Sequence, residues 1–99
     1  MGLDDAQREI ILRHANRLLS SRDYPKTICP SEIARALSKE ELRVLNASDW
    51  RSTMEDIREI VWEKREAREV EVLQKGEVVG VEWLEDIKGP IRVRKIQSE

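Results

Sequence analysis

The chain has 99 residues, the length of one domain, and residues 1–99 show no internal repeat, low-complexity tract or linker. Its formal net charge is −2, which argues against strong non-specific nucleic-acid binding, because proteins that grip phosphates usually carry a basic excess. The chain contains a single cysteine and no apolar run approaching ~20 residues, which excludes an internal disulfide and a membrane-spanning helix.

The first predicted helix covers residues 4–19. Asp4 can cap its N-terminus, and Gln7 stands three residues later, as a capping box requires. Apolar side chains then recur at the spacing of one helix face. The members of this stripe are Ile11, Ala15, Leu18 and Leu19.

A loop and a short extended segment are expected over residues 20–29. Pro25 disfavours helix at the residue before it, and residues 26–29 are predicted to form one edge strand. Pro30 suits the first position of a helix, where its missing N–H has no partner to lose. A second helix is therefore predicted from Pro30 to about residue 37. Its buried side chains are expected to be Ile33, Ala34 and Leu37.

Two further helices are predicted in the middle of the chain. Ser38 and Glu41 form a second capping-box pattern, which predicts a short helix over residues 38–45. The longest clean helical period follows over residues 48–68, with Ser48 as a suitable N-cap. Its apolar stripe consists of Trp50, Met54, Ile57, Val61 and Trp62.

After residue 68 the apolar period changes from helical to two, which is typical of strands. A first strand begins at Val70, Lys75 and Gly76 give a turn signal, and residues 77–79 form a return strand. Residues 80–88 are compatible with either a loop or one helical turn.

Residues 91–96 are predicted to form the last strand, with apolar and basic side chains on opposite faces. The apolar face has Ile91 and Val93, and the basic face has Arg92 and Arg94. Helices followed by a hairpin are the order of a winged helix, with residues 48–68 in the position of the recognition helix. The predicted fold class is therefore α+β: a winged helix of three to four helices with a small antiparallel sheet, in one domain over residues 1–99.

Four segments carry a family resemblance. They are residues 26–35 (KTICPSEIAR), Trp50-Arg51 with Met54, Ile57 and Arg58, residues 70–76 (VEVLQKG) and residues 89–94 (GPIRVR). In this order they resemble a family of small, mostly bacterial proteins classed only as a domain of unknown function, whose members are similar to winged-helix proteins. The KTICPSE and GPIR pieces are the most specific. The resemblance covers nearly the whole chain and implies a fold, but it implies no catalytic residues.

The chain departs from that family's pattern in two places. The link between the second and third main helices is long, with the extra residues LSKEELRVLNAS, which predicts an added helix. Residues 66–69 replace a short connection that usually contains glycine, which predicts that the long helix runs further.

The first functional hypothesis is a DNA-binding module. A winged helix places its third main helix in the major groove and its wing along the backbone or in the minor groove. The candidate contacts are Arg51 and Arg58 on the helix and Lys75, Arg92, Arg94 and Lys95 on the wing.

The charges of the two candidate elements differ. Residues 48–69 hold five basic and seven acidic side chains, and phosphates would repel the acids, so a solvated helix face is the favoured interpretation there. Residues 88–95 hold four basic side chains and no acid. Contact with an acidic partner or a nucleic-acid backbone, and protection of an edge strand by charge, both remain open for that strand.

The second hypothesis is a protein-interaction module without nucleic-acid binding, with a homodimer as one form. Its candidate surface is the wing with Trp83 and Leu84, near Val81 and Ile87. An exposed Trp83 would be an interaction anchor, because aromatic side chains often dominate interfaces. The favoured expectation is instead that this group packs into the core.

Catalysis is not expected. Cys29 precedes Pro30 at a predicted helix start, where a thiol can become reactive, but free cysteines are usually buried and a packed, inert thiol is favoured. His14 is the single histidine, and a metal site would need three or four ligands. We therefore expect no enzyme, cofactor, metal or membrane partner. The lone cysteine and the absence of a signal-like N-terminus lead us to expect an intracellular, cytoplasmic protein.

Overall fold

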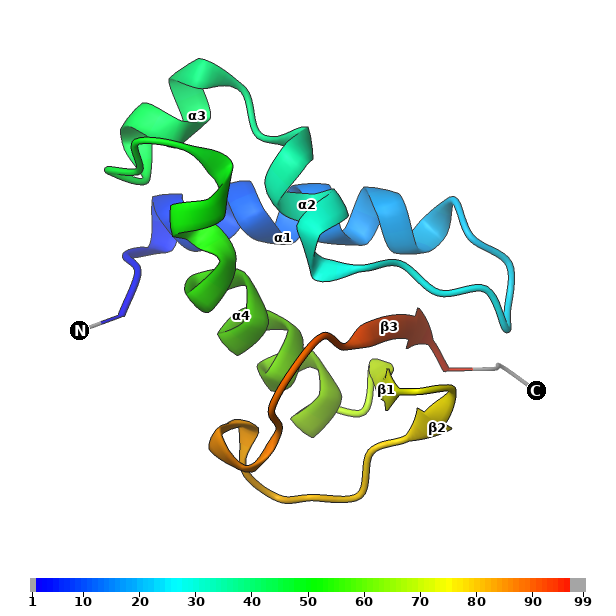
Figure 1. Cartoon of the computed structure of the whole chain (residues 1–99). Coiled ribbons are helices and arrows are strands. Elements are labelled where there is room, and N and C mark those ends of the chain that lie inside the picture. The colour runs from blue at the N-terminus through cyan, green and yellow to red at the C-terminus, as the bar shows by residue number, and fades with distance from the viewer. Residues whose placement is uncertain (1, 97–99) are drawn as a thin grey trace.

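A computed structural model of the chain describes residues 2–96. Within that range the chain forms four α-helices and a small three-stranded antiparallel sheet (Figure 1). The fold is α+β, as the sequence predicts, and the order of its elements is consistent with a winged helix. None of the helices in the described part of the chain is long and apolar enough to cross a bilayer.

The first three helices begin where their capping residues predict. Helix α1 covers Asp5–Ser20, α2 covers Pro30–Ala36 and α3 covers Lys39–Val44. Asp4 accepts a hydrogen bond from the backbone N–H of Gln7 at 2.8 Å, and Ser38 does the same for Glu41 at 3.1 Å. Both capping boxes are complete, and the extra residues between α2 and the long helix do form an added helix.

The long helix begins differently from the prediction. A 3-10 turn, η1 (Trp50–Thr53), precedes α4 (Met54–Glu66). The cap is Asp49, whose carboxylate accepts from the backbone N–H of Ser52 at 3.0 Å, so the choice of Ser48 as N-cap was wrong. The tight turn starts at Trp50, and Asp49 is the extended residue immediately before it, which places its side chain over the free N–H groups.

The sheet has the strand order β2–β1–β3, with β1 (Val70–Gln74), β2 (Glu77–Val78) and β3 (Arg92–Lys95). The turn between β1 and β2 is Lys75-Gly76, as predicted. Both residues have positive φ, 54° and 82°, which a tight two-residue hairpin favours. In the central pairing Val72 lies opposite Val93, so both apolar strand faces point to the same side.

The predicted edge strand over residues 26–29 is reduced to a single bridge. Ile28 and Val93 exchange two backbone hydrogen bonds of 2.7 and 2.8 Å. The segment is too short for a strand, because Lys26 belongs to a turn closed onto Asp23 and a helix begins at Pro30. The bridge still adds Ile28 to the outer side of β3 and ties the loop between α1 and α2 to the sheet.

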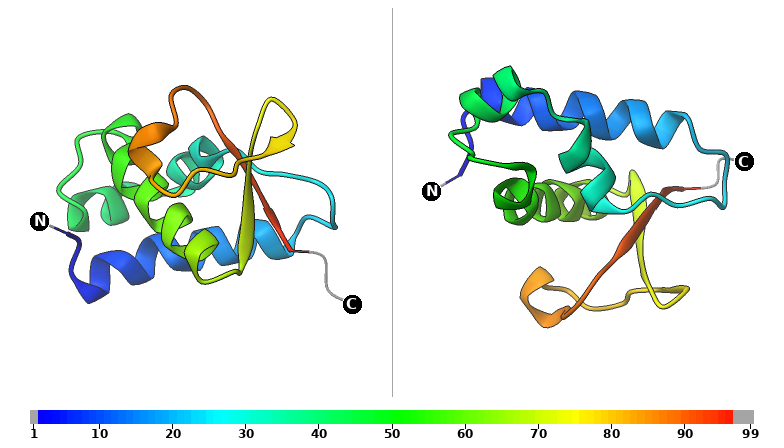
Figure 2. Two further views of the ribbon diagram at one scale, coloured as in Figure 1. Left: turned by 90° about the horizontal axis from the view of Figure 1, so that it is seen from below. Right: turned by 45° about the horizontal axis from the view of Figure 1, so that its top comes forward.

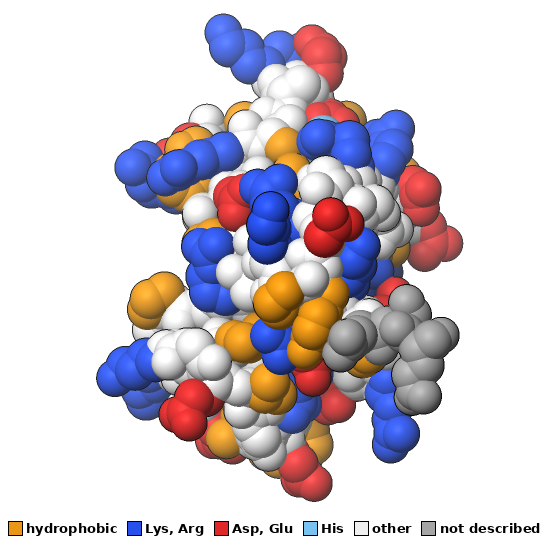
Figure 3. Space-filling view, turned by 90° about the vertical axis from the view of Figure 1, so that its right-hand side faces the viewer, with side chains coloured by type: hydrophobic (Ala, Val, Ile, Leu, Met, Phe, Trp, Pro, Cys, Tyr) orange, Lys and Arg blue, Asp and Glu red, His pale blue; other side chains and the backbone are white. Residues whose placement is uncertain are grey.

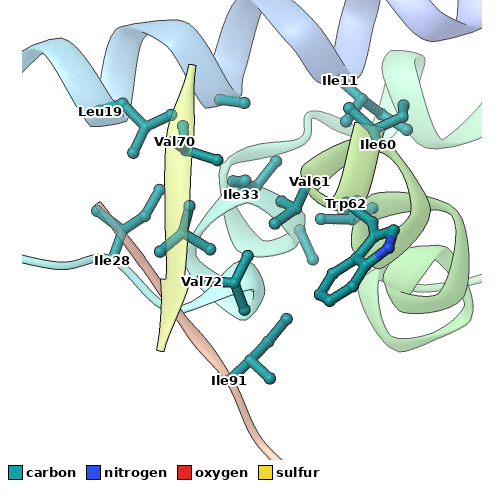
Figure 4. Close-up of a cluster of buried hydrophobic side chains, with 14 of the residues drawn as sticks. Ile11, Leu19, Ile28, Ile33, Ile60, Val61, Trp62, Val70, Val72 and Ile91 are labelled. Atoms are coloured by element: carbon teal, nitrogen blue, oxygen red, sulfur yellow. The ribbon is translucent and has the colours of Figure 1, made fainter. Parts of the chain in front are cut away.

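The core lies between the helices and one face of the sheet (Figure 4). The stripe of α4 faces it: Ile57, Val61 and Trp62 are buried, as predicted, while Trp50 and Met54 are half-buried. The predicted stripe omits Ile60, which is only 2% exposed. Side chains from several elements meet there, among them Ile11, Leu19, Ile28, Ile33, Ile60, Val61, Trp62, Val70, Val72 and Ile91.

Candidate interaction surface on α4 and the wing

The segment from Val79 to Ile91, which we call the wing loop, joins β2 to β3. It lies beside the C-terminal half of α4 and carries one 3-10 turn, η2 (Leu84–Asp86), so the helical-turn alternative for residues 80–88 is the one observed (Figures 1 and 2).

Three side chains of α4 hold the wing loop. Arg58 donates from Nη1 to the carbonyl of Gly89 at 3.2 Å, and Trp62 donates from Nε1 to the carbonyl of Glu82 at 3.3 Å. Arg65 donates from Nη2 to the carbonyl of Val79 at 3.4 Å. Donors at positions 58, 62 and 65 share one side of a helix, because they are spaced by four and three residues. These bonds pair backbone carbonyls that the irregular loop does not pair internally.

The neighbouring flank of α4 is acidic and faces solvent. Its members are Glu55, Glu59, Glu63 and Glu66, spaced by four, four and three residues, and all four are exposed. Glu63 pairs with Arg8 of α1, and Glu66 contacts Arg65 at 3.4 Å. Within residues 2–96, Glu55 and Glu59 take part in no ion pair. The solvent side of the helix in the recognition position is therefore negative.

A groove runs between this acidic flank and η2. One hollow of about 340 Å³ is lined by Glu59, Trp62, Glu63, Glu66, Trp83, Leu84 and Glu85. A second, of about 260 Å³, continues it along the helix and is lined by Glu55, Arg58, Glu59, Leu84, Glu85 and Ile87. The two hollows share Glu59, Leu84 and Glu85. We call them together the Trp83 groove.

Trp83 is 63% exposed, so the expectation that it packs into the core was wrong. It has extended backbone geometry and precedes the single turn of η2. That turn directs Leu84 and Ile87, which are three residues apart, toward α4: Leu84 packs against the core and Ile87 is 8% exposed. The indole of Trp83 is left at the wall of the groove.

The two predicted DNA contacts on the long helix lie in different environments. Arg51 is exposed in η1, with its guanidinium 4.6 Å from the ring centroid of Trp50, and Arg35 of α2 approaches the same ring at 4.8 Å. Arg58 is half-buried and bonded to Gly89. The structure thus leaves Arg51 accessible and uses Arg58 to hold the wing loop.

Two of the three predicted contacts on β3, Arg92 and Arg94, are also engaged within the protein. Arg92 is exposed and donates from Nε to Oγ1 of Thr27 at 2.9 Å. Arg94 donates to Glu71, its cross-strand partner, at 2.8 Å, and its guanidinium lies 4.8 Å from the ring of Tyr24. Lys95 is half-buried at the end of the strand.

Lys75 and Arg92 do come together, where the end of the wing loop meets the turn between β1 and β2. Gln74, Lys75, Lys88, Gly89, Pro90 and Arg92 line a hollow of about 440 Å³ that contains three cations and no acid. Gln74 shapes it by donating to the carbonyl of Lys88 at 2.6 Å. Lys88 belongs to the predicted basic run but was not among the predicted contacts. We call this feature the wing-base hollow.

Figure 3 shows the charges on one face of the molecule, the face that carries the hairpin and the loop between α1 and α2. Lysine and arginine side chains are scattered over it, with acidic side chains among them, and they do not merge into one continuous positive band.

Cys29 and His14 lie apart from both surfaces. Cys29 is half-buried at the start of α2 and accepts a hydrogen bond from Ser31 Oγ at 3.1 Å. His14 bonds through Nε2 to the carboxylate of Glu41 at 2.9 Å, while Arg17 lies 3.0 Å from its Nδ1. No group of three or more histidine, cysteine or acidic side chains is arranged for a metal ion in the region from Gly2 to Ile96.

Comparison with known proteins places the chain in a family. A family model described as "protein of unknown function (DUF3253)" matches residues 8–96, which is most of the chain. No curated protein matches the sequence. The chain therefore belongs to the DUF3253 family of proteins of unknown function.

Proposed function

We propose that the protein is a protein-interaction module that binds its partner through the Trp83 groove. The observation that carries the proposal is the 63% exposure of Trp83 on a loop that three hydrogen bonds hold against α4. Tryptophan is enriched among the residues that dominate binding energy at protein interfaces. Because the loop that carries this indole is held against α4, its backbone loses little conformational freedom on binding, which favours affinity.

The charge of α4 supports a protein partner rather than insertion of this helix into a DNA groove. Its accessible flank presents Glu55, Glu59, Glu63 and Glu66, and phosphates would repel these carboxylates. The arginines of the helix that could offset them, Arg58 and Arg65, point to the wing loop. The proposed role is binding, with no catalytic step assigned to the protein.

Partner capture from cells, with and without Trp83, tests the proposal. Wild type, Trp83→Ala and Val44→Ala would be compared after chemical cross-linking. Val44 is 49% exposed on α3, so its truncation is a control that shortens an exposed apolar side chain away from the groove. We expect Trp83→Ala to lose partners that wild type and Val44→Ala retain. Recovery of the same partners by all three proteins, or of none by wild type, would contradict the proposal.

DNA binding through the wing is the second candidate, because one observation favours it. The wing-base hollow gathers Lys75, Lys88 and Arg92, and no acidic side chain of residues 2–96 lines it, an arrangement suited to backbone phosphates. In this proposal the wing-base hollow lies along the DNA backbone, and the acidic flank of α4 stays outside the grooves of the DNA. Arg51 adds an exposed cation at the start of the helix.

Binding to duplex DNA over a range of salt concentrations tests this second candidate. We expect Lys75→Gln with Lys88→Gln to weaken binding and to lower the salt slope by about 0.9 for each phosphate that the variant no longer neutralises. Lys26→Gln with Lys39→Gln removes the same charge from exposed positions outside the hollow and serves as control. Absence of binding by wild type at low salt would reject DNA as a partner.

A further inference from the structure

We infer that the occupant of the Trp83 groove is a cationic segment of a partner protein, with arginine or lysine beside an apolar side chain. The inference rests on the proposed function and adds the chemistry of the partner.

The charge around the groove selects a cation. Residues 54–66 and 82–86 together hold eight acidic and three basic side chains, and Arg8 of α1 adds one cation by pairing with Glu63. The three basic ones are occupied: Arg58 and Arg65 bond wing-loop carbonyls, and Lys64 is buried and paired with Glu69 at 2.9 Å. An approaching carboxylate or phosphate would meet Glu59, Glu85 and their neighbours, whereas a guanidinium or ammonium group would be attracted.

The aromatic rings of the chain give an independent indication. The described residues contain four aromatic side chains, and three of them have an arginine stacked on the ring. Arg35 and Arg51 lie over Trp50, Arg65 lies over Trp62, and Arg94 lies over Tyr24, at 4.3 to 4.8 Å from the centroids. Among the aromatic rings of residues 2–96, Trp83 is the one without a stacked arginine. It is also the most exposed of them. A cation from a partner would complete the same contact there.

The groove also offers apolar surface next to the acids. Leu84, which is half-buried, lines it together with the exposed Trp83, and a partner's apolar side chain can cover them while its cation meets Glu59 or Glu85. A second copy of this chain is a less suitable occupant. The basic wing-base hollow of one copy could meet the acidic groove of the next. Such a contact is head-to-tail, so it adds further copies without end unless the rotation between copies closes a ring.

Titration of the protein with short synthetic peptides tests the inference. One peptide carries arginines and leucines, and two matched peptides replace the arginines by glutamate or by glutamine. We expect the arginine peptide to bind, with an affinity that falls as salt is added, and the glutamate peptide not to bind. Trp83→Ala and the pair Glu59→Gln with Glu85→Gln should each weaken binding by roughly tenfold.

A charge-matched control separates local recognition from general attraction. Glu9→Gln with Glu77→Gln makes the same change in net charge at exposed positions outside the groove, and we expect less than about a twofold effect. If this pair weakens binding as much as the groove pair, or if the arginine peptide does not bind at low salt, the inference is rejected. Circular dichroism of each variant shows whether a loss reflects unfolding.

The outcomes also distinguish the inference from the proposed function. If Trp83→Ala loses its cellular partners although the arginine peptide does not bind, the groove remains an interaction site and the cationic partner is rejected. If light scattering shows that wild type grows in mass with concentration and Trp83→Ala does not, a second copy is the occupant and the inference is wrong.

Discussion

Glu41 shows how one side chain can serve two elements. Its carboxylate accepts from the backbone N–H of Ser38 at 2.8 Å, which completes the cap of α3, and it bonds His14 of α1. The hydrogen bond from Ser38 lowers the pKa of Glu41 first, and His14 lowers it further, while partial burial opposes the shift. The charged form is therefore the one that the fold stabilises.

Glu41→Gln should test this account through its pH dependence. A carboxyl whose pKa is lowered by folding stabilises the native state above its unfolded pKa, and that contribution disappears as pH falls through the folded pKa. At neutral pH we expect the variant to lose about 0.5–1 kcal/mol of unfolding free energy, measured in urea. The difference from wild type should shrink as the pH is lowered below about 4.5 and toward the folded pKa. A difference that stays constant down to acidic pH would contradict the assignment.

The sequence was informative about residues with local partners. Asp4 and Ser38 cap their helices as predicted, because a capping box needs only residues three positions apart. Trp83 was misjudged because its exposure depends on how the wing loop meets α4, which is a contact between segments distant in the chain. Ile60 was omitted from the predicted stripe although its spacing from Ile57 and Val61 already placed it on the same face.

Helix α4 is the element on which the core and the groove both depend. Its buried side carries Ile57, Ile60 and Val61, its acidic flank faces solvent, and the side between them holds the wing loop. The sequence predicted the apolar side from its period and the acidic excess from a count. The charges also had a readable spacing: four glutamates recur every three or four residues, while Arg51, Arg58 and Arg65 recur every seven. The sequence could not show that two of those arginines, Arg58 and Arg65, bind backbone carbonyls of the wing loop.

Ile57→Ala should be strongly destabilising. The side chain is fully buried between α4 and its neighbours, so truncation removes apolar packing and also leaves a cavity. We expect a loss of 2–5 kcal/mol, to be checked by denaturant unfolding. Glu55→Ala, two residues earlier on the exposed flank, should change stability by less than about 0.5 kcal/mol. Equal effects of the two substitutions would mean that the helix faces are assigned wrongly.

Arg58→Ala with Arg65→Ala should loosen the wing loop while the core stays folded. Both side chains donate to loop carbonyls, and apart from the stacking of Arg65 on Trp62 they do not belong to the packing of the core. We expect the amides of residues 79–91 to exchange faster than in wild type, while the amides of β1 and of the helices stay protected. Arg43→Ala on α3, which removes an exposed arginine with one surface ion pair, is the control. Unchanged exchange in the wing loop would show that these bonds do not hold it.

At the scale of the whole molecule, charge is separated between surfaces. The acidic residues of α4 and η2 surround the Trp83 groove, while three cations gather at the wing-base hollow. A net charge of −2 averages over this separation, so the composition alone argued against DNA without indicating where a partner would bind. The groove forms where the wing loop meets α4, and the hollow forms where the end of the same loop meets Gln74 and Lys75, so neither position could be read from the order of the residues.

Mapping of amide and indole chemical shifts by NMR, during titration with the arginine-containing peptide, shows directly whether the Trp83 groove is the binding site. We expect the perturbed signals to belong to the indole of Trp83, to residues 82–87 and to the exposed flank of α4 around Glu59. Perturbations that gather instead at Lys75, Lys88 and Arg92, or that are absent at saturating peptide and low salt, would contradict it.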